Sequence, residues 1–272
     1  MSAIDRVFET ARRENRAALI SFLMAGDPTP EATVGLARAL EEAGADILEL
    51  GVPFSDPVAD GPVLQRSAAR ARGQGVDVER VFALVRRIRG ETRLALVLFS
   101  YLNPLLRHGI ARAATEARDS GFDGVLVTDL PPEEAREHQP FFRSAGLDTI
   151  FLVSPTSSAS RMSAAARLAS GFLYVVSRPG TTGTRPAAPA DLPETISRAK
   201  RAAGPLPLAV GFGIATPQAV REAALLADGV VVGSAIVEAA EMAGSARERA
   251  VGEMVRSLAL ACRRNRSKLP SS

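Results

Sequence analysis

Short apolar runs and longer amphipathic stretches alternate along the whole chain. The runs are rich in Val, Ile and Leu and are only a few residues long, which is typical of buried parallel strands. They predict eight strands, at 19–24, 46–50, 94–100, 124–128, 149–153, 172–176, 208–211 and 229–232.

The stretches between these runs carry apolar residues three and four positions apart, which predicts helices. The predicted helices cover 30–43, 78–89, 107–120, 132–145, 159–169, 191–203, 216–227 and 246–263. A further helix at 4–14 precedes the first strand, and a short extra helix follows the eighth. Glycines such as Gly44, Gly90 and Gly121 come directly after helices and favour the left-handed residue with which many helices end.

This order of elements predicts one α/β domain, a closed (β/α)8 barrel or TIM barrel. A chain of 272 residues suits such a barrel, which needs about 250. We assign residues 1–264 to the barrel, including the extra helices at both ends, and expect 265–272 to be a disordered tail. An open, doubly wound sheet is the competing arrangement.

Composition and charge exclude several kinds of protein. The net charge is only +3 and the arginines are dispersed among acidic residues, which indicates solvated helix faces rather than a nucleic-acid surface. The apolar run at 17–25 is too short to span a membrane. Because Cys262 is the one cysteine, no disulfide can form within the chain. We therefore expect a cytoplasmic protein that binds neither nucleic acid nor membrane.

Two carboxylates mark the end of the second predicted strand. Glu49 lies inside its apolar run, and Asp60 follows eleven residues later in a loop rich in Pro and Gly. Burial raises the pKa of a carboxyl group, so the pair suggests acid–base catalysis near neutral pH. Two alternatives stay open: a buried ion pair between Glu49 and an arginine, and an ordinary Asp-Gly turn at Asp60.

Small residues follow the seventh and eighth predicted strands: Gly211, Gly213, Gly233 and Ser234. They leave backbone N–H groups bare where helices begin, and barrels of this kind often bind phosphate there. Glycines that only allow tight packing are the alternative.

Four aromatic residues fall at or near strand ends: Phe22, Tyr101, Tyr174 and Phe212. Together they predict walls for a flat, apolar substrate. The segment 177–189 is long for a strand–helix connection and predicts a lid; a disordered insertion is the alternative.

Missing residue types narrow the chemistry. The two histidines, His108 and His138, fall on outer segments far from the cysteine, so no metal site is predicted. Lys200 and Lys268, the only lysines, do not end strands, which excludes a Schiff-base aldolase. Cleavage of a carbon–carbon bond would then require a substrate with its own electron sink, together with carboxylates that move protons.

The stretch from Leu48 to Pro62 closely resembles the signature of the tryptophan synthase α-subunit family. Further blocks resemble the same family in the same order: 101–104, 129–134, 177–185, 211–214 and 233–236. The resemblance covers about residues 3–262. It implies a lyase that splits indole-3-glycerol phosphate into indole and glyceraldehyde 3-phosphate.

The resemblance also implies a role for each site residue. Glu49 would protonate indole C3 and take the proton of the side-chain hydroxyl. Asp60 would hold the indole N–H, and Thr182 would close toward it. The pocket would be lined by Phe22, Tyr101, Tyr174 and Phe212. The phosphate would be surrounded by Gly183, Gly211, Gly213, Gly233 and Ser234.

The family further implies a partner. Asp56 and its loop would face a β subunit in an αββα complex, and indole would pass between the subunits through a tunnel. Pyridoxal phosphate is expected only in that β subunit, and no cofactor is expected in this chain. Met24 and Leu102 differ from the residues that are usual in the family.

Other functions remain possible from the sequence. The chain could be a stand-alone lyase that releases free indole. It could instead be a catalytically silent activator of a β subunit. A different phosphate-binding barrel, such as a sugar-phosphate isomerase, is a further alternative.

Overall fold

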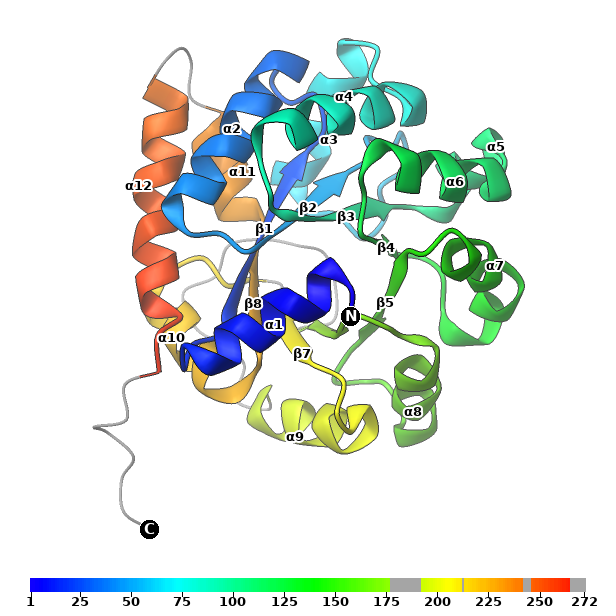
Figure 1. The fold of residues 1–272 in the computed structure, drawn as a ribbon, viewed down its shortest axis with the longest axis vertical. Coiled ribbons are helices and arrows are strands. Elements are labelled where there is room, and N and C mark those ends of the chain that lie inside the picture. Colours follow the sequence, from blue (N-terminus) through cyan, green and yellow to red (C-terminus); the bar gives the residue numbers. More distant parts are fainter. Residues whose placement is uncertain (177–191, 212, 242–245, 265–272) are drawn as a thin grey trace.

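Eight parallel strands form a closed ring in the computed structural model, which describes residues 1–176, 192–211, 213–241 and 246–264 (Figure 1). Each strand pairs with the next in sequence, and the last pairs with the first. The strands are β1 (Ala18–Met24), β2 (Ile47–Gly51), β3 (Ala95–Ser100), β4 (Gly124–Val127), β5 (Asp148–Val153), β6 (Leu173–Val176), β7 (Leu208–Gly211) and β8 (Gly229–Val232). The TIM barrel predicted from the sequence is confirmed, and the open sheet is wrong.

Helices surround the ring on the outside, except α1, which lies across one end of it (Figure 1). Those before β4 are α1 (Ala3–Arg13), α2 (Pro30–Ala43), α3 (Pro62–Gly73), α4 (Val78–Glu91), α5 (Leu102–His108) and α6 (Ile110–Ser120). Those after β4 are α7 (Pro132–Ser144), α8 (Ala159–Leu168), α9 (Leu192–Ala203), α10 (Pro217–Leu226), α11 (Ser234–Ala240) and α12 (Ala246–Ala261). The helix before the first strand and the short helix after the eighth are present as predicted.

Two helical regions differ from the prediction. Helix α3 was not expected, because apart from Leu64 its buried face consists of small residues such as Ser67 and Ala68, which give little apolar periodicity. The predicted helix at 107–120 is two helices, α5 and α6, separated at Gly109 with φ of 90°. Glycine adopts this φ without the steric cost that a side chain would bring.

The prediction that Gly44, Gly90 and Gly121 end helices is confirmed for two of the three. Gly44 and Gly121 are left-handed caps, with φ of 98° and 112°. Gly90 is not a cap, because α4 continues through it to Glu91.

Helix α1 closes the amino-terminal end of the ring. Its buried residues include Ile4 and Phe8, and the rings of Phe8 and Phe172 lie 5.6 Å apart. A methyl group added at Gly229 would lie 3.1 Å from Cε1 of Phe8, so the glycine makes room for this plug. Since one end of the barrel is filled, a substrate has access only from the carboxyl ends of the strands.

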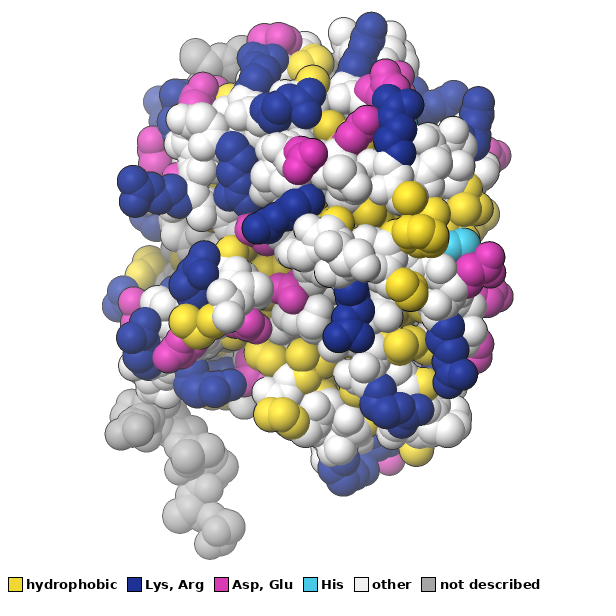
Figure 2. Space-filling model, turned by 45° about the vertical axis from the view of Figure 1, so that its right-hand side comes forward, with side chains coloured by type: hydrophobic (Ala, Val, Ile, Leu, Met, Phe, Trp, Pro, Cys, Tyr) yellow, Lys and Arg dark blue, Asp and Glu magenta, His cyan; other side chains and the backbone are white. Residues whose placement is uncertain are grey.

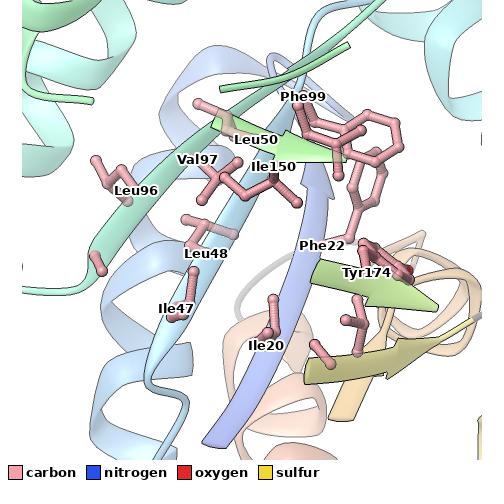
Figure 3. Close-up of a cluster of buried hydrophobic side chains, with 14 of the residues drawn as sticks. Ile20, Phe22, Ile47, Leu48, Leu50, Leu96, Val97, Phe99, Ile150 and Tyr174 are labelled. Carbon is pink, nitrogen blue, oxygen red and sulfur yellow. The ribbon is translucent and has the colours of Figure 1, made fainter. Parts of the chain in front are cut away.

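Aromatic rings line the carboxyl-terminal end. Phe22 packs edge-on against Phe99, with ring centroids 5.1 Å apart. Figure 3 shows Phe22 and Phe99 toward the end of the barrel to which the β1 arrow points, while Ile20 and Ile47 lie toward the other end.

Basic and acidic side chains are intermixed over the face shown in Figure 2. Ion pairs on the surface of the described part of the chain include Arg112 with Glu116 at 2.7 Å and Arg161 with Glu133 at 3.0 Å. None of the helices in the described part of the chain is both long enough and apolar enough to cross a membrane.

Candidate active site

Glu49 points into the barrel from β2. Its side chain shares a face of the strand with Gly51, because alternate residues of a strand face the same side. A methyl group at Gly51 would meet the ring of Phe22 and the sulfur atom of Met24. The charge of Glu49 also acts on Tyr174 of β6, and β6 lies on the opposite side of the ring from β2. Both side chains therefore face the interior.

The Glu49 carboxyl group is buried and forms no ion pair with any residue that the structure describes. Only 1% of the residue is exposed, and its Oε1 atom has no hydrogen-bond partner among the described residues. Burial raises the pKa of Glu49 from 4.5 to about 8. No arginine pairs with it in the described part of the chain, so the ion-pair alternative is not supported. At neutral pH the group is protonated and can donate a proton.

Asp60 lies on the loop between β2 and α3. Its backbone is held on both sides: its N–H donates to Pro57 O at 3.0 Å, and Gln65 Nε2 donates to its carbonyl at 2.8 Å. Burial raises the pKa of its carboxyl group from 3.8 to about 6, although the hydrogen bond from the Tyr101 hydroxyl partly opposes the rise. Asp60 is therefore mostly ionised at pH 7, whereas Glu49 is not.

Tyr101 connects Asp60 to the third strand. It is the N-cap of α5, and the next residue, Leu102, donates its backbone N–H to Asp129 Oδ1 at 2.7 Å. The Tyr101 hydroxyl donates to Asp60 and accepts from Ala59 N–H at 3.0 Å. Asp129 thus fixes the start of α5, and Tyr101 holds the loop that carries Asp60.

Tyr174 lies opposite Glu49 and beside Gly211. Burial, and next the negative charge of Glu49, raise the pKa of Tyr174 well above its ordinary value, so its hydroxyl stays neutral. A methyl group at Gly211 would lie 2.3 Å from that hydroxyl oxygen. The absence of a side chain at Gly211 therefore leaves space for Tyr174.

The residues predicted to bind phosphate follow β7 and β8. Gly213 has a φ of 86°, which favours glycine. Gly233 lies next to Phe22, since a methyl group there would be 3.4 Å from Phe22 Cβ. Ser234 is buried and begins α11. The first N–H groups of a helix have no acceptor within the helix, so those of Ser234 and Ala235 can meet an anion.

Some predicted site residues lie outside the described part of the chain: Thr182, Gly183 and Phe212. The predicted lid at 177–189 and the tail at 265–272, with Lys268, lie outside it as well.

Other sequence signals fall away from the site. Lys200 lies on α9, and His108 ends α5, where its Nε2 is 2.8 Å from Glu116 Oε2. Among the described residues, no group of three or more His, Cys, Asp or Glu side chains could hold a metal ion.

Two further aromatic residues of this region were not predicted from the sequence. Phe99 packs against Phe22, and Phe54 packs against Tyr101 with ring centroids 5.3 Å apart. Phe99 occupies the predicted third strand at a position facing the mouth. The alternation of that strand was the signal that could have found it.

Two buried carboxyl groups with raised pKa values among aromatic rings, at the open end of a closed α/β ring, are typical of the active site of a TIM-barrel enzyme. A sequence model of the family described as tryptophan synthase alpha chain matches residues 8–264. The chain belongs to this family.

Individual relatives agree with this assignment. The tryptophan synthase alpha chain of Solibacter usitatus is 49% identical over 241 residues, covering 89% of this chain and 90% of the relative. That of Geobacter sulfurreducens is 48% identical over 238 residues, covering 88% and 90%. A solved structure of Mycobacterium tuberculosis tryptophan synthase superimposes with a TM-score of 0.89 at 35% identity, covering 97% of this chain and 99% of that chain.

Proposed function

We propose that Glu49 and Asp60 are the two catalytic carboxylates with which this chain cleaves indole-3-glycerol phosphate. As a tryptophan synthase alpha chain, it is a lyase that yields indole and glyceraldehyde 3-phosphate for tryptophan biosynthesis. The observation that supports the residue roles best is the pairing of a buried, protonated Glu49 with an ionised Asp60 at one mouth of the barrel.

The reaction begins at the indole ring. Protonated Glu49 donates its proton to C3, and the ring becomes an indolenine whose nitrogen bears positive charge. The Asp60 carboxylate accepts the hydrogen bond from the ring N–H and stabilises that charge. The indole nitrogen thereby serves as the electron sink, so neither a lysine nor a metal ion is needed for this step.

Bond cleavage then restores both the ring and the catalyst. The Glu49 carboxylate takes the proton of the hydroxyl on the carbon attached to C3, and the carbon–carbon bond breaks. The hydroxyl oxygen becomes the aldehyde of glyceraldehyde 3-phosphate, and the bonding electrons return to the indole ring. Indole keeps the proton at C3, and Glu49 is again protonated.

The walls of the site hold the two ends of the substrate. We assign the flat indole to Phe22, Tyr101 and Tyr174. The phosphate is assigned to backbone N–H groups at Gly211, Gly213, Gly233 and Ser234. The roles of Thr182, Gly183 and Phe212 are proposed from the family resemblance alone.

Loss of activity in two variants tests this proposal. Glu49→Gln removes the transferable proton, so we expect indole release to fall by at least roughly 10²-fold. Indole release by Asp60→Asn should also fall severely, because a neutral amide cannot balance the positive charge of the indolenine. Glu137→Gln is the control, since Glu137 is exposed on α7. Near-normal release of indole by Glu49→Gln would refute the role of Glu49.

Membership of the alpha chain family implies a β-subunit partner. We propose an αββα complex in the cytoplasm, in which this chain carries no cofactor and Asp56 faces the β subunit. Next to Asp56, Val58 is 78% exposed and Leu106 on α5 is 46% exposed. A cleft of about 480 Å³ is lined by Phe54 and Ser55, which directly precede Asp56, and by Arg107 and His108, which directly follow Leu106. Exposed apolar groups beside a cleft favour protein docking.

The same assay tests the partner. Indole release should rise when a tryptophan synthase β subunit is added, and Asp56→Ala should reduce that rise without abolishing the basal rate. Turnover that does not respond to a β subunit would favour a stand-alone lyase. Binding of the substrate without release of indole would indicate a silent activator.

A further inference from the structure

Asp27, Arg70 and Glu241 form a row of ion-paired side chains that connects neighbouring strand–helix units of the barrel. Asp27 follows β1, Arg70 lies on α3 after β2, and Glu241 directly follows α11 after β8. Since β8, β1 and β2 are neighbours in the ring, these residues join three consecutive strand–helix units. None of the three was singled out in the sequence.

Arg70 uses both edges of its guanidinium group. Its Nε and Nη2 donate to the two carboxylate oxygens of Asp27, at 2.7 and 2.8 Å. Its Nη1 donates to Glu241 Oε1 at 2.9 Å. Ser67, one turn earlier on α3, also donates its hydroxyl to Asp27. Bidentate pairs between an arginine and a carboxylate are strong and fix the orientation of the planar guanidinium group.

The buried Asp27 carboxylate holds these ion-paired side chains in a fixed position. The Asp27 side chain is only 2% exposed, while those of Arg70 and Glu241 are 35% and 29% exposed. A buried carboxylate with several donors cannot move without losing its hydrogen bonds. Arg70 is therefore held in place by Asp27 and, in turn, holds Glu241.

The two helices that Arg70 connects begin at opposite ends of the proposed substrate site. Helix α3 starts at Pro62, two residues after Asp60, and its Gln65 binds the Asp60 carbonyl. Helix α11 starts at Ser234, which belongs to the proposed phosphate-binding residues, here called the phosphate cradle: Gly211, Gly213, Gly233 and Ser234. The position of α3 sets the carboxylate that holds the indole, and the position of α11 sets the phosphate.

We propose that Arg70 is a positioning residue that fixes the separation between Asp60 and the phosphate cradle. It touches no substrate, and it acts through α3 and α11. This inference rests on the proposed function, because it takes Asp60 and the cradle as the two ends of the site. It predicts that loss of the ion pair between Arg70 and Glu241 weakens the binding of ligands that span both ends of the site. The binding of ligands that occupy only one end should not change.

Binding measurements on the full chain separate these two effects. The spanning probe is a substrate analogue that lacks both glycerol hydroxyls and cannot be cleaved. The single-end probes are indole and glyceraldehyde 3-phosphate. In Glu241→Gln we expect the spanning probe to bind about 5-fold more weakly, the scale of a partly exposed charged hydrogen bond. The dissociation constants of indole and of glyceraldehyde 3-phosphate should not change.

Two further variants sharpen the test. Arg70→Lys keeps the charge but cannot reach both partners with one planar group, so its loss for the spanning probe should exceed that of Glu241→Gln. Glu238→Gln is the matched control, because it removes the same charge from α11 at an exposed residue for which no ion pair occurs in the described part of the chain. It should bind all three probes as the unaltered chain does.

Two results would overturn the inference. One is equal affinity of Glu241→Gln and Glu238→Gln for the spanning probe. The other is an equal loss for a single-end probe, which would mean that the ion pair shapes one subsite rather than their separation. Failure of the proposed function looks different: the unaltered chain would then not bind the spanning probe, or Glu49→Gln would still release indole.

Discussion

A methyl group placed on Gly51 would lie 2.6 Å from Cζ of Phe22 and 3.2 Å from Sδ of Met24. Gly51 is therefore the position at which β2 leaves space for the aromatic wall of the site, two residues after Glu49. Any side chain there must displace the end of the Phe22 ring, which also packs edge-on against Phe99.

We predict that Gly51→Ala lowers kcat/KM for indole-3-glycerol phosphate by roughly 10-fold, since a shift of the wall by a fraction of an ångström disturbs the reacting geometry. Steady-state kinetics and thermal unfolding would be measured together. Gly90→Ala is the control, because no atom would lie within 4 Å of the added methyl group. Unchanged kinetics in Gly51→Ala would show that Phe22 does not shape the site.

The pKa values of the two carboxyl groups predict a bell-shaped pH profile. The proposed mechanism requires ionised Asp60 and protonated Glu49, whose pKa values are about 6 and about 8. Activity should therefore rise as the pH passes 6 and fall as it passes 8. A profile of kcat/KM against pH measures both limbs.

Tyr101→Phe should move only the rising limb. The Tyr101 hydroxyl favours the ionised form of Asp60 by donating a hydrogen bond, so its removal raises the pKa of Asp60. The limb near pH 6 then shifts to higher pH, and the limb set by Glu49 stays. The substrate phosphate titrates identically in both enzymes, so the difference between the two profiles reports Asp60. A rising limb that does not move would contradict the assignment.

Glu49→Gln should be more stable than the unaltered chain, by an amount that depends on pH. The pKa of Glu49 is about 8 in the folded chain and near 4.5 when unfolded, so between these values the folded state holds a proton that the unfolded state loses. Stability of the unaltered chain therefore falls as the pH rises through this window, by about 1.4 kcal/mol per pH unit.

Urea unfolding at pH 5 and pH 8 checks this prediction. The advantage of Glu49→Gln should be small at pH 5 and should reach several kcal/mol at pH 8. Glu137→Gln, an exposed change, should show no such trend. An equal difference at both pH values would mean that Glu49 is not buried as a protonated group.

Ser21 offers a stability test away from the site. It is fully buried in β1, and its Oγ has no hydrogen-bond partner in the described part of the chain. Ser21→Ala should therefore stabilise the fold, by about 1 kcal/mol, since it removes an unpaired hydroxyl group. Ser120→Ala should instead destabilise it, because the buried Ser120 hydroxyl donates to Ala117 O at 2.8 Å. A lower melting temperature for Ser21→Ala than for the unaltered chain would contradict this view.

The sequence predicted the eight strands to within one residue at each end, as at β7 and β8. Runs of Val, Ile and Leu are a local signal. Because these strands are buried on both faces, each one appears in the sequence as a continuous apolar run, and the ends of the run mark the ends of the strand. Helix α3 escaped prediction for the opposite reason. Its buried face uses Ser67, Ala68 and Ala71, and small residues carry almost no apolar period.

The sequence by itself also indicated which side chains could do chemistry, since Glu49 is a charged residue between leucines of a buried strand. Only the tertiary structure decided how these groups act on one another. Ring closure places Glu49 opposite Tyr174, and it brings Arg70 to Asp27 and Glu241, which are 43 and 171 residues away in sequence. Such pairings depend on which strands become neighbours, and that choice is made by packing of the whole ring rather than by any local pattern.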